Sequence, residues 1–114
     1  MIKIYHNPRC AKSREGLEIL KNSGKDFTIV KYVDDLLSEE ELRDILQKLN
    51  LTPIELVRKN EKIWKENFKG KLLSDTEIIQ AMVKNPKLIE RPIVISKNKA
   101  VIGRPSEKIA EIIK

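Results

Sequence analysis

The order of the predicted strands and helices limits most strongly what this chain of 114 residues can fold into. Alternating Ile and polar residues predict a short strand at Ile2–Tyr5. A helix should begin at about residue 10 or 11, end at Asn22 and be closed by Gly24. β-branched and aromatic residues predict a second strand at Phe27–Val33. Two strands joined by a crossover helix are expected to be parallel.

The middle of the chain, from about residue 38 to 84, is predicted to be helical. Ser38 and Glu41 form a capping box before one helix, and Pro53 stands at the first position of another. Trp64 and Phe68 belong to a looser segment near Gly70. A further helix begins at Ser74 or Asp75 and is stopped before Pro86.

The C-terminal part returns to strands. Ile93–Ser96 and Ala100–Gly103 are predicted to form a β-hairpin, and Ser106 should cap a last helix. A β-α-β unit followed by a hairpin and a helix is typical of the thioredoxin-like fold. We therefore expect one α/β domain over residues 1–114, with a mixed four-stranded sheet and an inserted helical segment at about 38–84.

Composition excludes several classes of protein. The chain has one cysteine and one histidine, so an internal disulfide is impossible and a zinc site is not expected. Apolar runs are too short to span a membrane, and no secretory signal is visible, which predicts a cytoplasmic protein. The net charge is +6, but Lys and Glu are interleaved. We therefore expect no nucleic-acid partner, no membrane association and a monomer.

Cys10 is the strongest candidate for chemistry because it lies where the first strand turns into the first helix. A helix N-terminus offers unpaired N–H groups and partial positive charge, which stabilise the nucleophilic thiolate. Arg9 and Arg14 flank it and favour the same ionised form. Ser13 is close enough in sequence for its hydroxyl to reach the sulfur, and His6 could tune protonation of the thiol. A buried, inert cysteine and a partly exposed strand-end histidine are the alternatives.

Three other arginines stand at element ends in a chain whose basic residues are mostly lysine. Arg58 is expected to end the helix that begins at Pro53, whereas Arg91 and Arg104 border the two C-terminal strands. Three planar guanidinium groups could bind a tetrahedral oxyanion, although ordinary surface ion pairs would use the same residues. The thioredoxin-like fold also favours a cis peptide bond at Pro92.

Four segments together resemble the glutaredoxin-dependent arsenate reductases of the ArsC family, within the ArsC/Spx superfamily. They occur in the family's order and extend over nearly the whole chain. The segments are Tyr5–Arg14, Leu56–Asn60, Glu90–Val94 and Gly103–Ser106.

This resemblance implies an oxidoreductase that reduces arsenate to arsenite for arsenic detoxification. Cys10 would be the nucleophile, and Arg58, Arg91 and Arg104 would hold arsenate or a similar oxyanion. His6 and Ser13 would keep the thiol ionised. No bound cofactor or metal is implied, because glutathione and glutaredoxin would act as reductants from outside.

Two alternatives follow from the same superfamily. Many arsenate reductases continue beyond the last helix, whereas this chain ends at Lys114. Short members include Spx-like transcriptional regulators that bind RNA polymerase and ArsC-like thiol oxidoreductases with another substrate. Regulators of the Spx type generally carry Cys-x-x-Cys, whereas Ser13 takes the place of the second cysteine here. The serine at position 13 and the presence of all three arginines favour the reductase.

Overall fold

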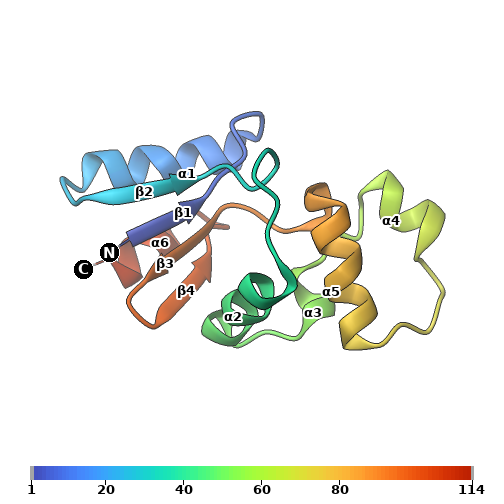
Figure 1. The fold of residues 1–114 in the computed structure, drawn as a ribbon. Coiled ribbons are helices and arrows are strands. Elements are labelled where there is room, and N and C mark those ends of the chain that lie inside the picture. The colour runs from blue at the N-terminus through green and yellow to red at the C-terminus, as the bar shows by residue number, and fades with distance from the viewer. Residues whose placement is uncertain (1, 114) are drawn as a thin grey trace. The chain divides into compact units, whose positions relative to one another are not determined.

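A computed structural model describes residues 2–113, which divide into two compact units (Figure 1). One unit contains residues 2–35 and 91–113 and carries the sheet. The other contains residues 36–90 and is helical. The helical unit contains the predicted inserted segment of about 38–84 and extends beyond it at both ends. The assignment of the whole chain to one domain stays a prediction.

The first unit confirms the mixed four-stranded sheet of a thioredoxin-like fold. Its strand order is β2-β1-β3-β4, with β1 and β2 parallel and the other two pairings antiparallel. A helix connects the parallel pair, as a crossover requires. The strands are β1 (Ile2–Tyr5), β2 (Phe27–Val30), β3 (Ile93–Ser96) and β4 (Lys99–Ile102).

Two helices share an apolar core with this sheet. Leu20 of α1 (Ala11–Asn22) and Ile109 of α6 (Glu107–Ile112) are fully buried in a cluster with Ile4 and Val94. Each such side chain contributes about 1.5–3 kcal/mol when it is removed from water. This packing fixes the start of α1 relative to the strands, and the candidate nucleophile lies at that start.

The helical unit is built from short helices with strong local start signals. Capping boxes precede three of them, at Ser38, Thr52 and Ser74. Each box satisfies backbone N–H groups that a helix start would otherwise leave without a partner. The elements are α2 (Glu39–Leu49), α3 (Pro53–Leu56), α4 (Lys62–Asn67), α5 (Asp75–Lys84) and the 3₁₀-helix η1 (Pro86–Leu88).

The second predicted strand is shorter than expected. β2 ends at Val30 because the N–H groups of Asp34 and Asp35 both donate to the carbonyl of Lys31, which turns the chain. Local sequence made residues 31–33 look extended, but a turn removes them from the sheet. Tyr32 therefore lies in this turn and not in a strand.

Other boundaries also differ from prediction. α3 ends at Leu56, so Arg58 lies beyond the helix, after the bridge that pairs Val57 with Ile89. Residues 62–67 form helix α4 where a looser segment was predicted; the stacked rings of Trp64 and Phe68, with centroids 5.4 Å apart, support it.

The hairpin and the last cap show smaller differences. β4 begins at Lys99, so the hairpin loop has two residues, and Lys97 adopts a φ of 59° there. Ser106 stands before α6 as predicted, yet its side chain makes no capping hydrogen bond. The predicted place of Ser106 at the helix start is correct, but the side-chain hydrogen bond expected of a capping serine is not made.

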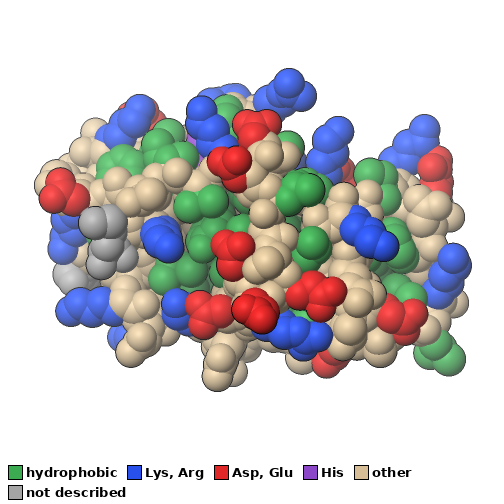
Figure 2. Space-filling model, viewed as in Figure 1, with side chains coloured by type: hydrophobic (Ala, Val, Ile, Leu, Met, Phe, Trp, Pro, Cys, Tyr) green, Lys and Arg blue, Asp and Glu red, His purple; other side chains and the backbone are tan. Residues whose placement is uncertain are grey.

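Charged side chains are mixed over the surface. Figure 2 shows Lys and Arg side chains spread across one face with Asp and Glu between them. Within residues 2–113, no helix combines the length and the apolar composition that a membrane crossing needs.

Candidate active site

Cys10 caps the start of α1, as the sequence predicts. Its backbone N–H donates to the carbonyl of Asn7 at 3.0 Å, and its own carbonyl accepts from the N–H of Arg14 at 3.0 Å. The side chain is half-buried and the thiol is free. The turn between β1 and α1 therefore holds the sulfur at the positive end of a helix.

Two guanidinium groups meet at the Cys10 sulfur. Arg104 directs Nη2 to Sγ at 3.6 Å, and Arg91 also hydrogen-bonds to the thiol. The two arginines are joined to each other, since Nε of Arg104 donates to the carbonyl of Arg91 at 2.8 Å. Two residues from separate sequence motifs are thus brought together at the candidate nucleophile.

These contacts govern the ionisation of the thiol. Burial alone raises the pKa of the Cys10 thiol. The hydrogen bond from Arg91 lowers it, as do the positive charge of that group and the backbone N–H groups of Ser13 and Lys12. The lowering contributions prevail, so the pKa lies below its ordinary value, as a nucleophilic cysteine needs.

His6 and Ser13 form a buried pair beside the nucleophile. His6 Nδ1 lies 2.6 Å from Ser13 Oγ, and the backbone N–H of Asn7 donates to the same oxygen at 2.9 Å. Burial lowers the pKa of His6, and nearby Lys31 and Arg14 lower it further, although a hydrogen bond with the backbone of Ser13 raises it. The imidazole is therefore neutral near pH 7 and shares a hydrogen bond with the Ser13 hydroxyl.

This geometry changes the role expected for Ser13. We expected its hydroxyl to reach the sulfur; in the structure that hydroxyl hydrogen-bonds with His6 and accepts from the backbone N–H of Asn7. The backbone N–H of Ser13 is the group that hydrogen-bonds to Cys10. Ser13 thus joins the histidine to the helix start, and the helix backbone acts on the thiol.

Arg14 hydrogen-bonds to the loop that precedes Cys10. Its side chain is exposed, and Nη1 donates to the carbonyl of Pro8 at 2.9 Å. We expected Arg9 and Arg14 to favour the thiolate, and this stays a prediction; among the causes that lower the pKa of Cys10, the hydrogen bond from Arg91 is the largest. Arg14 holds the backbone between Pro8 and α1.

Arg58 belongs to the helical unit. Its guanidinium forms ion pairs with Glu61 (Nη1–Oε1, 3.8 Å) and Glu90 (Nε–Oε1, 3.3 Å), and its backbone N–H donates to the carbonyl of Leu88 at 2.7 Å. Glu90 immediately precedes Arg91 in the sequence. The convergence of Arg58 with the other two arginines stays a prediction.

Pro92 packs at the centre of the first unit, next to Arg91. The Arg91–Pro92 peptide bond is cis, and so is Arg104–Pro105. A Cβ added to Gly16 would lie 2.8 Å from Cγ of Pro92, and one added to Gly103 would lie 2.9 Å from the same atom. Such distances are too short for a side chain. The two glycines therefore let α1 and the end of β4 approach the proline.

Tyr32 is a residue near the site that sequence reasoning did not select. It is 1% exposed, and its phenol interacts with the guanidinium of Arg91. In the sequence it looked like one more aromatic residue of a strand. Only the turn after β2 reveals a different role.

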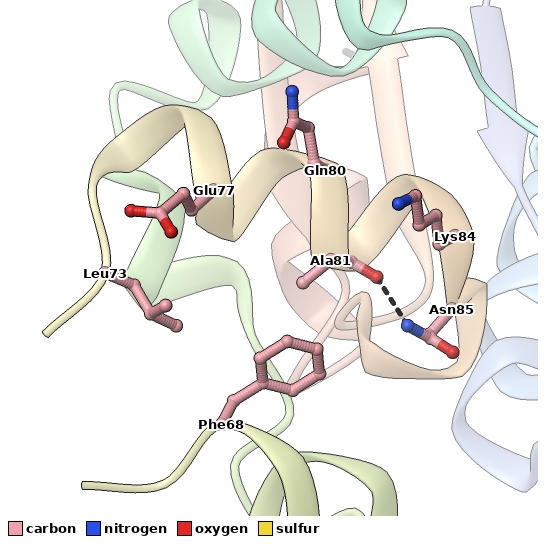
Figure 3. Close-up of a pocket in the computed structure, with 7 residues that line it drawn as sticks. All are labelled: Phe68, Leu73, Glu77, Gln80, Ala81, Lys84 and Asn85. Carbon is pink, nitrogen blue, oxygen red and sulfur yellow. Dashed lines mark hydrogen bonds between the residues drawn. The ribbon is translucent and has the colours of Figure 1, made fainter. Parts of the chain in front are cut away.

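A separate cavity of about 210 Å³ lies in the helical unit (Figure 3). Two of its polar side chains are engaged locally: Glu77 caps α5 with Ser74, and Nδ2 of Asn85 donates to the carbonyl of Ala81 at 3.0 Å. Among the residues that the structure describes, no group of three or more metal-ligating side chains occurs. The cavity is lined by Phe68, Leu73, Glu77, Gln80, Ala81, Lys84 and Asn85.

The family of the chain follows from comparison with known proteins. The model of the ArsC family matches residues 5–112, a span that contains every residue of the site described above. The chain belongs to the ArsC family. The family predicted from four short segments is thereby confirmed.

Individual relatives align over almost their full length. The chain is 48% identical to the uncharacterized protein YfgD of Escherichia coli K12 over 98% of its own length and 96% of that protein. It is 39% identical to an arsenate reductase of Neisseria meningitidis serogroup B, over 98% of this chain and 97% of that one.

A solved structure agrees with this relationship. The arsenate reductase from Vibrio cholerae is 43% identical and superposes with a TM-score of 0.92, over 97% of this chain and 96% of that chain. A family member named arsenate reductase thus shares this fold at 43% identity.

Proposed function

We propose that this protein is a glutathione- and glutaredoxin-dependent arsenate reductase. The observation that carries the proposal is the placement of Cys10 at the start of α1 with the guanidinium groups of Arg91 and Arg104 at its sulfur. The names of relatives in Neisseria and Vibrio support arsenate as the substrate.

The same groups that favour the thiolate suit an oxyanion. Arsenate is a tetrahedral anion, and guanidinium groups donate parallel N–H bonds to such oxygens. The first N–H groups of α1 add donors at the same place. Arg91 and Arg104 would therefore hold arsenate against the sulfur, with Arg58 as a third ligand.

The chemistry requires two thiols. The Cys10 thiolate would attack arsenic, a sulfur–arsenic bond would form, and one protonated oxygen would leave as water. A glutathione thiolate would then attack the Cys10 sulfur. The new disulfide breaks the sulfur–arsenic bond and leaves its electron pair on arsenic, so As(V) becomes As(III) and arsenite departs.

An external thiol is needed because Cys10 is the only cysteine in the chain. The mixed disulfide between Cys10 and glutathione would be reduced by glutaredoxin, which returns the thiolate for another cycle. Glutathione keeps thiols reduced in the cytosol, so we place the activity in the cytoplasm.

A coupled assay tests this function. We expect arsenate-dependent oxidation of NADPH in the presence of glutathione, glutathione reductase and glutaredoxin. Cys10→Ser should abolish it, because a serine hydroxyl remains protonated at neutral pH. Folding of the variant is checked by thermal unfolding. Full activity of Cys10→Ser, or no arsenate-dependent oxidation by the native chain, would refute the proposal.

A further inference from the structure

Tyr32 is buried in a segment that is otherwise mostly exposed. Its neighbours Lys31 and Asp34 are exposed, whereas Tyr32 retains 1% of its accessible surface. The turn that follows β2 holds it, and the last carbonyl of β2, from Val30, accepts from the N–H of His6 at 2.9 Å. This turn is therefore anchored beside the loop that carries the nucleophile (Figure 1).

A buried phenol needs a polar partner for its hydroxyl. The guanidinium of Arg91 supplies this partner. Both the hydroxyl of Tyr32 and Nε of Arg91 are shielded from solvent. Burial would lower the pKa of Arg91, but its interactions with Cys10 and Tyr32 raise it. One guanidinium is thus shared between the thiol and the phenol.

The geometry of the guanidinium explains what this sharing does. Arginine carries five N–H donors fixed in one plane, so a hydrogen bond at one edge orients the others. Arg104 Nε bonds only to the backbone carbonyl of Arg91. The side-chain direction of Arg91 must be fixed by other contacts, and Tyr32 is placed to fix it.

We propose that Tyr32 is a positioning residue that orients the guanidinium of Arg91 toward the Cys10 sulfur and the anion bound there. The part of this inference that concerns the bound anion rests on the proposed function. The contact with the thiol exists in the protein without substrate. Tyr32 would act through Arg91 and not on the reacting atoms themselves.

The test removes the hydroxyl and keeps the ring. In Tyr32→Phe we expect the pH midpoint of Cys10 alkylation by iodoacetamide to rise by about 0.5–1 pH unit, a part of the one to three units that an adjacent arginine provides. Tyr5→Phe is the matched control, since it removes the hydroxyl of the other tyrosine, and it should leave the midpoint unchanged.

A double-mutant cycle separates positioning from general destabilisation. The kcat/KM for arsenate should fall about three- to tenfold in Tyr32→Phe, and adding this change to Arg91→Lys should cost little more. A structural role would instead give an additive loss. If Tyr32→Phe folds poorly, 3-fluorotyrosine at position 32 takes its place, because its hydroxyl is a weaker acceptor on a ring of nearly the same shape. This substitution should also raise the pH midpoint of Cys10 alkylation.

An unchanged alkylation midpoint in folded Tyr32→Phe, or additive losses with Arg91→Lys, would overturn the inference. Because the alkylation readout needs no arsenate, it can fail while the native chain still reduces arsenate. It can equally succeed in a protein that proves to act on another anion.

Discussion

At the scale of single residues, the account depends on arginines that act as planar forks. Lysine keeps the charge but provides one point donor. We expect Lys substitutions at Arg58, Arg91 and Arg104 each to lower kcat/KM for arsenate by about 10- to 150-fold. This range corresponds to about 1.5–3 kcal/mol per charge-assisted hydrogen bond, at 1.36 kcal/mol per decade.

Arg43→Lys is the control for this series. Arg43 is exposed in α2 and donates from Nη2 to Thr76 Oγ1 at 3.0 Å, a residue outside the site. Steady-state kinetics should show no loss in this variant. Lys variants at the three proposed positions that are as fast as Arg43→Lys would refute anion recognition by guanidinium forks.

His6 should make stability depend on pH. Its pKa in the folded chain lies below the ordinary 6.5 because burial disfavours the charged imidazole. As pH falls below 6.5, the unfolded chain takes up a proton that the folded chain does not. The free energy of unfolding should therefore decrease until pH passes the lowered pKa.

Urea denaturation at several pH values measures this effect. In His6→Gln the difference between neutral and mildly acidic pH should shrink, because no imidazole remains to be protonated on unfolding. The same change in the free energy of unfolding with pH in both proteins would contradict a neutral buried histidine. So would a native chain that gains stability as pH falls through 6.5.

At the scale of secondary-structure elements, the end of β4 must pass close to Pro92 and α6. A Cβ at Gly103 would lie 2.8 Å from Cδ1 of Ile109 and 2.9 Å from Cγ of Pro92. We expect Gly103→Ala to lower the free energy of unfolding by about 1–3 kcal/mol through overpacking. Chemical denaturation measures this loss.

A second substitution identifies the clash. Ile109→Val removes Cδ1 and should by itself cost about 0.5–1.5 kcal/mol. Combined with Gly103→Ala, it should cost less than the sum, because one of the two close atoms is gone. Strictly additive losses would mean that contact with Ile109 of α6 does not limit the size of the side chain at position 103.

Elements with local signals were predicted well. The capping boxes at Ser38 and Ser74 lie within four residues, so the sequence contains both partners of each hydrogen bond. β2 was predicted too long because Tyr32 and Val33 are typical strand residues, whereas the backbone N–H groups of Asp34 and Asp35 donate to Lys31 and turn the chain there. α4 was missed because its six residues have no capping side chain at Glu61.

At the scale of the whole molecule, sequence predicted the position of the candidate nucleophile, Cys10, at a helix start but only part of its surroundings. Cys10 could be selected from its strand–turn–helix context alone. The meeting of Arg91 and Arg104 at its sulfur joins residues more than eighty positions away, which no local pattern specifies. The role of Tyr32 needed the same long-range information. The approach of Arg58 remains a prediction from its motif.

The central claim is that Cys10 and one external thiol together supply the two electrons that reduce arsenate. A single-turnover experiment with protein, arsenate and glutathione, without glutaredoxin, tests it most directly. We predict equal amounts of arsenite and of Cys10 in a disulfide with glutathione, and neither product in Cys10→Ser. Arsenite formed equally by Cys10→Ser, or none formed by the native chain, would contradict the claim.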